Sequence, residues 1–159
     1  MPSLLDIAEH FFVAEGWEYQ RLEHREILRM GFTGGNGNWT CFVQSREAQR
    51  QIAFYSICPL RVPESKRQLV CEFLTRANYG LIVGNFEQDW DDGEVRYKTS
   101  LDVEDSELTP SLLAHIVYAN VTAMDRYLPG IIAVLAGSQT PLDAIAAIEA
   151  SNEPDLSKS

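Results

Sequence analysis

The segment Asn78–Asp102 constrains the fold of this chain more than any other part of its sequence. Gly80 ends a helix, Leu81–Gln88 has the composition of a β-strand, and Glu94–Leu101 alternates polar with apolar residues. Between these two strands, the pair Asp92-Gly93 is a strong short-range signal for a hairpin turn. The segment therefore predicts a solvated antiparallel hairpin, and it contains no recognisable catalytic constellation.

Hydrophobic periodicity, caps and turn residues predict the other elements. Strands come in consecutive blocks and do not alternate with helices, which favours an antiparallel α+β fold of order α-β-β-β-α-β-β-α with a C-terminal helical extension. The expected elements outside the hairpin are a helix Leu4–Glu15 capped by Ser3, strands Glu26–Thr33, Trp39–Ser45 and Gln51–Cys58, a helix from Pro63 to Gly80, a helix from Pro110 to Leu128 that Pro129-Gly130 kinks or breaks, a short helix Ile131–Ala136 and a last helix Thr140–Ala150.

Length and charge bound the organisation and the partners. The 159 residues predict one domain over residues 1–150, followed by a polar disordered tail over residues 151–159. The net charge of −10 argues against nucleic acid and anionic membranes as partners. A local basic patch remains an alternative to ordinary solvated residues for the cations at Arg46, Arg50, Arg61, Lys66 and Arg67.

The cysteines and histidines give no support for catalysis or for a cofactor. Cys41, Cys58 and Cys71 form no CxxC pair, and each has apolar neighbours, so buried reduced thiols are expected. The three histidines fall on separate elements without metal-ligand spacing. We therefore expect no enzymatic activity, no cofactor and no metal. The N-terminus lacks the pattern of a secretory signal, which favours a cytoplasmic protein.

Two glycine-containing turns invite a ligand but are interpreted as hairpin turns. Gly34–Asn38 resembles a phosphate-binding loop, yet it lacks a following Lys-Ser/Thr and precedes a strand. Asp89–Gly93 resembles a calcium loop, yet its glycine is one position early, and Ser100 stands where the bidentate glutamate belongs.

Aromatic residues on the strands and turns are the candidate contact residues. Each belongs either to ordinary core packing or to an exposed apolar sheet face that receives a partner. Trp90 lies among acids at a predicted turn tip, where burial within its own subunit is difficult. The partner-binding candidates are Trp39, Phe42, Tyr55, Phe86, Trp90 and Tyr97.

An ordered set of segments resembles the YbjN-domain family over about Leu4–Leu135, in the style of its cyanobacterial branch. The segments are Trp39-Thr40-Cys41, Ile52–Ser56, Val62-Pro63, Glu72–Leu81, Gly84–Glu87 and Asp92–Tyr97. The resemblance implies a fold similar to type III secretion chaperones, usually as a homodimer, and no established catalytic residue. Members are described as sensory-transduction regulators or chaperone-like proteins. The extension Thr140–Ala150 lies beyond the resemblance.

Together these observations predict a non-enzymatic, homodimeric, chaperone-like or adaptor protein. It would bind a protein client through an apolar sheet or helix surface, in a cyanobacterial setting during assembly of a photosynthetic or carboxysome component. The acidic composition favours basic clients. The alternative is a sensory or regulatory protein that responds to a small molecule enclosed between the sheet and the long helix.

Overall fold

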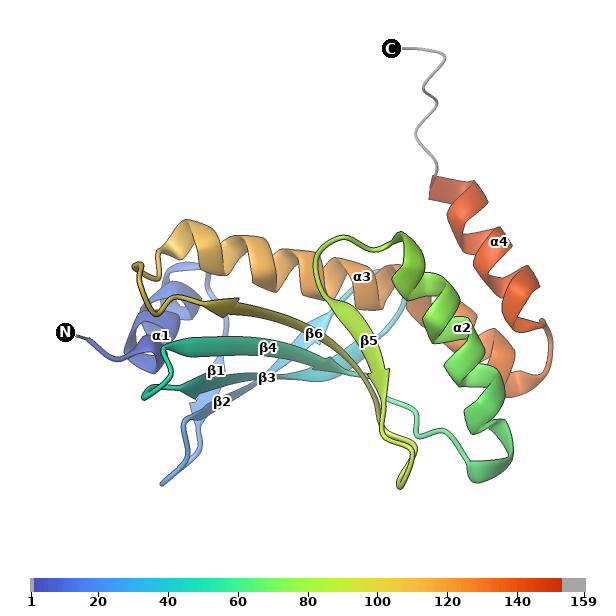
Figure 1. Cartoon of the computed structure of the whole chain (residues 1–159), viewed down its shortest axis with the longest axis horizontal. Helices are drawn as coiled ribbons and strands as arrows, with labels where there is room; N and C mark the ends of the chain where they lie inside the picture. Colours follow the sequence, from blue (N-terminus) through green and yellow to red (C-terminus); the bar gives the residue numbers. More distant parts are fainter. Residues whose placement is uncertain (1, 153–159) are drawn as a thin grey trace, which may run out of the picture.

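The computed structural model describes residues 2–152, which form one antiparallel sheet packed against helices (Figure 1). The strand order in the sheet is β1-β2-β3-β4-β6-β5. The elements are α1 (Leu4–Ala14), β1 (Tyr19–Arg21), β2 (Ile27–Thr33), β3 (Asn38–Arg46), β4 (Gln51–Ile57), the 3-10 turn η1 (Glu64–Lys66), α2 (Arg67–Gly80), β5 (Asn85–Gln88), β6 (Val95–Asp102), α3 (Pro110–Ala136) and α4 (Pro141–Asn152).

The predicted α+β class and element order are confirmed, with small differences at the edges of the sheet. The short strand β1 was not predicted, and it pairs with β2 at one edge. At the other edge, β5 begins at Asn85, because Leu81–Gly84 forms a loop after α2. The predicted tail of residues 151–159 overlaps α4, which continues to Asn152, and the remaining residues 153–159 lie outside the described residues.

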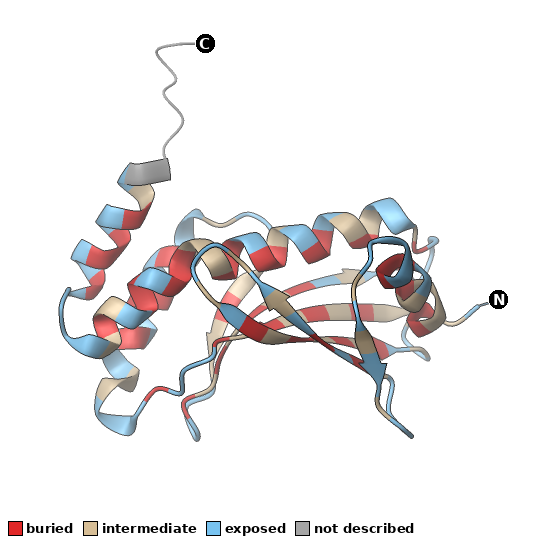
Figure 2. Ribbon diagram, turned by 180° about the vertical axis from the view of Figure 1, so that it is seen from behind, coloured by how far each residue is buried: buried red, intermediate tan, exposed pale blue. Residues whose placement is uncertain are grey.

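The helices pack on one face of the sheet, and the other face carries no helix in the described chain (Figures 1 and 2). Along β3 and β4, buried side chains alternate with half-buried or exposed ones. The buried set includes Trp39, Cys41, Val43 and Phe54, so these residues face the helices. We call the opposite side, which carries Phe42 and Tyr55, the open face of the sheet.

One carboxylate and one hydroxyl stabilise the start of α1. The Ser3 hydroxyl accepts a hydrogen bond from the Asp6 backbone N–H, as the sequence predicted. The Glu47 carboxylate, from the turn between β3 and β4, accepts from the backbone N–H groups of Leu4 and Leu5 at 2.9 and 3.1 Å. An acid at the positive end of the helix dipole fixes α1 against the sheet.

The long helix α3 is continuous from Pro110 to Ala136, so Pro129-Gly130 does not break it, and the predicted separate helix Ile131–Ala136 is wrong. Proline lacks an N–H and leaves the carbonyl four residues earlier, that of Asp125, without its helical donor. The side-chain amide of Asn36 donates to this carbonyl at 2.9 Å. Gly130 has no side chain where Phe73 of α2 and Ile148 of α4 approach α3. A partner from the turn before β3 and close helix packing therefore keep the helix intact.

The core lies between α3 and the sheet. Phe12, Trp17 and Phe54 form an aromatic cluster toward the N-terminal end of α3, and Phe73 and Tyr127 pack together near its C-terminal end. Between them, the buried side chain of Asn120 donates to the carbonyls of Phe54 and Tyr97 and to the Thr99 hydroxyl. This polar contact fixes the position of α3 across β4 and β6.

None of the helices in the described residues is both long enough and apolar enough to cross a bilayer.

Candidate functional site

The structure separates the six predicted contact residues into two groups. Trp39, Phe86 and Tyr97 are buried on the helix side of the sheet. Phe42 and Tyr55 are half-buried on the open face, and Trp90 is 58% exposed at the tip of the β5–β6 hairpin. A partner can therefore reach Phe42, Tyr55 and Trp90, whereas Trp39, Phe86 and Tyr97 serve the core.

Strand register places the two aromatic residues of the open face side by side. Phe42 of β3 pairs with Tyr55 of β4, Arg29 of β2 pairs with Phe42, and Lys98 of β6 pairs with Tyr55. Adjacent strands lie about 4.8 Å apart, so these four side chains form one row across the sheet. We call Arg29, Phe42, Tyr55 and Lys98 the aromatic row.

Two cations near the aromatic row, Arg96 and Lys98, share the carboxylate of Glu87. The guanidinium of Arg96 lies 4.4 Å from the centre of the Tyr55 ring and also contacts Glu87 at 2.9 Å, and Lys98 contacts Glu87 at 3.1 Å. Burial raises the pKa of Glu87, but hydrogen bonds from Lys98 and Arg96 outweigh it, so that pKa lies below its ordinary value. Glu87 therefore remains ionised near neutral pH and orients both cations.

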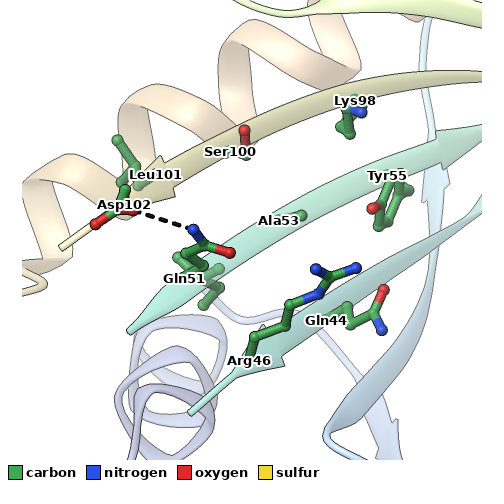
Figure 3. Close-up of a pocket in the computed structure, with 10 residues that line it drawn as sticks. Gln44, Arg46, Gln51, Ala53, Tyr55, Lys98, Ser100, Leu101 and Asp102 are labelled. Atoms are coloured by element: carbon green, nitrogen blue, oxygen red, sulfur yellow. Dashed lines mark hydrogen bonds between the residues drawn. The ribbon is translucent and has the colours of Figure 1, made fainter. Parts of the chain in front are cut away.

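A shallow hollow of about 290 Å³ adjoins the aromatic row on the open face (Figure 3). Small side chains make its floor, because Ala53 of β4 pairs with Ser100 of β6. Its sides carry polar groups from three neighbouring strands: Gln44, Arg46, Gln51, Tyr55, Lys98 and Asp102. Gln51 donates to Asp102 at 3.0 Å, so part of this polar rim is already satisfied.

Sequence reasoning missed the polar members of this hollow. Lys98 and Gln44 were predicted only as members of the alternating strands, and Arg46 was considered as part of a basic patch. The structure divides that patch: Arg46 lies at the end of β3, Arg61 pairs with Asp92, and Arg67 begins α2. The available signal was strand alternation, which places Gln44 and Arg46 on the same face as Phe42.

Two arginines fix the hairpin tip that carries Trp90. Arg67 donates from Nη1 to the Trp90 carbonyl at 3.1 Å, and Arg61 contacts the Asp92 carboxylate at 2.7 Å. Gly93, with φ of 77°, lies directly against the backbone of Val62, where no side chain would fit. The tip is therefore a tight turn that presents the Trp90 side chain, and Asp92 is engaged by Arg61.

The glycine-rich turn Gly34–Asn38 binds a carboxylate of its own chain. The backbone N–H groups of Gly35 and Asn36 donate to the Asp125 side chain at 3.1 and 2.8 Å, and Gly34 N–H donates to Gly37 O in a tight turn. A Cβ at Gly34 would collide with Asp125. The hairpin interpretation of this segment agrees with the structure, and its anion-binding groups are used to hold α3.

A second exposed surface lies where α2 leads into the edge strand β5. Tyr79 is 96% exposed and Ile82 95% exposed, and Val83 is half exposed. The Tyr97 hydroxyl donates to the Val83 carbonyl and holds this loop in place, and burial raises the pKa of that hydroxyl to about 12. We call Tyr79, Ile82 and Val83 the edge patch.

The two buried thiols are not activated as nucleophiles, and the third cysteine differs from expectation. Burial raises the pKa of Cys41 to about 11 and also raises that of Cys58, so both are neutral thiols near neutral pH. Cys41 contacts the Ser56 hydroxyl at 3.6 Å. Cys71, predicted to be buried, is exposed on α2. Within residues 2–152, no group of three or more His, Cys, Asp or Glu side chains is placed to hold a metal ion.

Known structures share this fold. YbjN from E. coli matches with a TM-score of 0.58 and 12% identity, over 84% of this chain and 90% of that one. The ExsC–ExsE complex matches with a TM-score of 0.53 and 11% identity, over 79% and 91%. The HopA1–SchA chaperone–effector complex matches with a TM-score of 0.50 and 12% identity, over 74% and 87%. Identities this low establish the fold alone, which is chaperone-like.

No curated protein is similar enough to this chain to count as a match. The family comparison is positive and covers residues 5–133, with α4 lying beyond the matched region. The matched family is YbjN, described as "Putative bacterial sensory transduction regulator". Since the match spans most of the helices and the whole sheet, the chain belongs to the YbjN family.

Proposed function

We propose that this protein is a non-enzymatic, cytoplasmic, chaperone-like adaptor that binds a protein client on the open face of its sheet. The observation that carries the proposal is the aromatic row: Phe42 and Tyr55 lie side by side on a face that the helices leave uncovered. Aromatic side chains supply much of the energy of protein interfaces when a partner covers them. Two solved structures of similar fold come from complexes, ExsC–ExsE and the HopA1–SchA chaperone–effector complex, which supports the proposal.

The mechanism is surface complementarity on a rigid platform. Helices α1 and α3 pack against the face of the sheet opposite the open face. The aromatic row therefore has the same position in the unbound protein as in the proposed complex. A client segment laid across the row would remove Phe42 and Tyr55 from water, and Trp90 would contact it at the end of the face. Preorganisation lowers the entropy cost of binding, because few side chains must be ordered.

The client in this proposal is a component of a photosynthetic or carboxysome assembly. This rests on the resemblance of the sequence segments to the cyanobacterial branch of the family. The open face would shield an apolar part of that component until its permanent partner replaces the adaptor.

The adaptor acts as a homodimer in this proposal, through the edge patch. Tyr79 and Ile82 are almost fully exposed, and they precede β5, an edge strand whose outer side has no neighbour in the described sheet. The Asn78 side chain already accepts from the Phe86 N–H and donates to the Phe86 carbonyl at this edge. The contact in this proposal is therefore made by the exposed apolar side chains, which are typical of surfaces between subunits.

A second candidate function is a sensor of a small molecule, which the hollow beside the aromatic row favours. Its rim presents Arg46, Lys98 and Gln44 over a floor of Ala53 and Ser100. The family description as a sensory transduction regulator agrees with this alternative. Native mass spectrometry of gently purified protein would reveal a retained ligand, and a bare polypeptide mass would argue against it.

Affinity capture from a native lysate tests the adaptor function. The wild type should enrich one protein in stoichiometric amount, and Phe42→Thr/Tyr55→Thr should lose it, because threonine keeps the strand but removes the aromatic area. The matched control is Val13→Thr, which removes an exposed apolar side chain from α1. Equal recovery by both variants would contradict a client site on the open face.

A further inference from the structure

The part of the open face around the aromatic row has a charge opposite to that of the whole protein. Away from the hairpin end, where Asp89 and Glu94 line a hollow together with Glu87 and Arg96, the strands direct four cations and two acids to this face. The cations are Arg29, Arg46, Arg96 and Lys98, and the acids are Glu87 and Asp102. The net charge of these side chains is therefore +2, whereas the chain carries −10. The acidic composition predicted basic clients, but the surface that carries the aromatic row has the wrong sign for them.

We propose that the open face recognises an acidic, extended polypeptide segment, an inference that rests on the proposed function and names the chemistry of the client. Glutamate or aspartate side chains of the segment would pair with Arg29 and Arg46. Apolar side chains between them would cover Phe42 and Tyr55.

Two of the four cations are available without breaking an existing ion pair. Arg96 and Lys98 share Glu87, whereas Arg29 and Arg46 are exposed and have no ion pair among the described residues. A carboxylate from a client would therefore gain a partner without displacing one at these two positions. Arginine suits this role, since its guanidinium binds carboxylates in a bidentate manner.

The spacing of the charges matches a short extended segment. Arg29 on β2 and Lys98 on β6 are separated by three strand spacings, about 14 Å. Arg46 and Arg96 lie at opposite ends of the face, about 20 Å apart along the strands at about 3.3 Å per residue. An extended peptide of about four to six residues spans these distances.

The same face is poorly suited to nucleic acid. The Tyr55 ring is already covered on one side by the Arg96 guanidinium, which limits its use as a platform for base stacking. The face also ends at the acidic turn formed by Asp89, Asp91, Asp92 and Glu94. A continuous polyanion would be repelled where it passed this turn, whereas a short acidic segment ends before it.

Fluorescence anisotropy with three labelled probes tests the inference on the full chain. The probes are a peptide in which Glu alternates with Val, the same peptide with Lys in place of Glu, and single-stranded oligothymidylate. We expect the acidic peptide to bind most tightly and to weaken as salt is raised. Arg29→Gln/Arg46→Gln should weaken it by about fivefold, from two partly exposed ion pairs.

The matched control is Lys66→Gln/Arg76→Gln, which removes the same charge from the helix side of the protein. This control variant should change the affinity for the acidic peptide by less than about twofold, because Lys66 and Arg76 act on the open face only at long range. An equal loss in both variants would overturn the inference, because it would reduce the effect to net charge.

The other outcomes separate the inference from the function on which it rests. Tighter binding of the basic peptide, lost in Phe42→Thr/Tyr55→Thr, would overturn the acidic specificity and leave the adaptor function standing. Tighter binding of oligothymidylate than of the acidic peptide would overturn the inference, because nucleic acid would then be the preferred ligand of the open face. Binding of none of the three probes would also overturn the inference, and the capture experiment with native lysate would then decide the adaptor function separately.

Discussion

Residues of the same type differ in burial and in the space around them, as the cysteines and glycines of this protein show. Cys41 and Cys58 are buried and Cys71 is exposed, although all three have apolar neighbours in the sequence. Gly130 lies against two side chains of other helices, whereas a Cβ at Gly31 on β2 would meet nothing within 4 Å. Chemically identical residues should therefore respond differently to reagents and to substitution.

Alkylation should label Cys71 alone in the native protein. The thiol of Cys71 is exposed and can meet the reagent, whereas burial raises the pKa of Cys41 to about 11 and keeps it neutral and inaccessible. Mass spectrometry after iodoacetamide treatment should show one added group natively and three after unfolding. Cys71→Ser should abolish the native labelling, and modification of Cys41 in the folded protein would contradict its burial.

Gly130→Ala should destabilise the protein by about 1–3 kcal/mol in urea denaturation. The added methyl collides with Phe73 and Ile148, and this strain exceeds the small gain in helix propensity. Gly31→Ala is the matched control, since it makes the same change to the unfolded chain and meets open space. Equal stability changes for the two variants would refute the packing explanation.

At the scale of elements, the turn before β3 and the helix α3 depend on each other. The turn directs the N–H groups of Gly35 and Asn36 to the Asp125 carboxylate, and the Asn36 amide replaces the helical donor that Pro129 lacks. One loop thus supports the helix where its own hydrogen bonding fails. A proline in the helix interior is tolerated because a distant segment supplies the missing donor.

A double-mutant cycle between Asn36 and Pro129 tests this dependence. Asn36→Ala should cost about 1 kcal/mol in the wild type, because the Asp125 carbonyl loses its donor. In the Pro129→Ala background the new backbone N–H satisfies that carbonyl, so the same substitution should cost close to nothing. Urea denaturation of the four proteins gives the coupling energy, and additive effects would show that the two residues act independently.

At the scale of the whole molecule, two surfaces remain for partners on different parts of the sheet. The open face carries the aromatic row, with an excess of positive charge around it, and the edge patch is apolar and lies beside β5. In the proposed function, their separation would allow the protein to dimerise through one surface while it binds a client with the other.

Sedimentation at micromolar concentration should show a dimer that dissociates in Ile82→Glu. Ile82 is 95% exposed in the isolated subunit, so a charge there costs the subunit little but would be buried and unpaired in a dimer. Val13→Glu, a charge added at an exposed position on α1, should leave the dimer intact. A wild-type monomer under these conditions would contradict the dimer.

Local signals in the sequence determined most of the elements and their order. Ser3 caps α1, Gly93 adopts the positive φ of the hairpin turn, and alternation identifies β3, β4 and β6, because each depends only on neighbouring residues. Tertiary structure decided which side of the sheet the helices cover. Alternation groups Trp39 apart from Phe42, but both groups contain large apolar residues, so periodicity alone cannot say which becomes core.

Contacts between residues far apart in the sequence explain the other differences between prediction and structure. The continuity of α3 through Pro129 depends on Asn36, which is far away in the chain, and the hollow on the open face depends on Ala53 and Ser100 meeting across two strands. Neither contact leaves a local signal in the sequence. The chain alone therefore determined its elements, and only their packing decided which residues remain available to a partner.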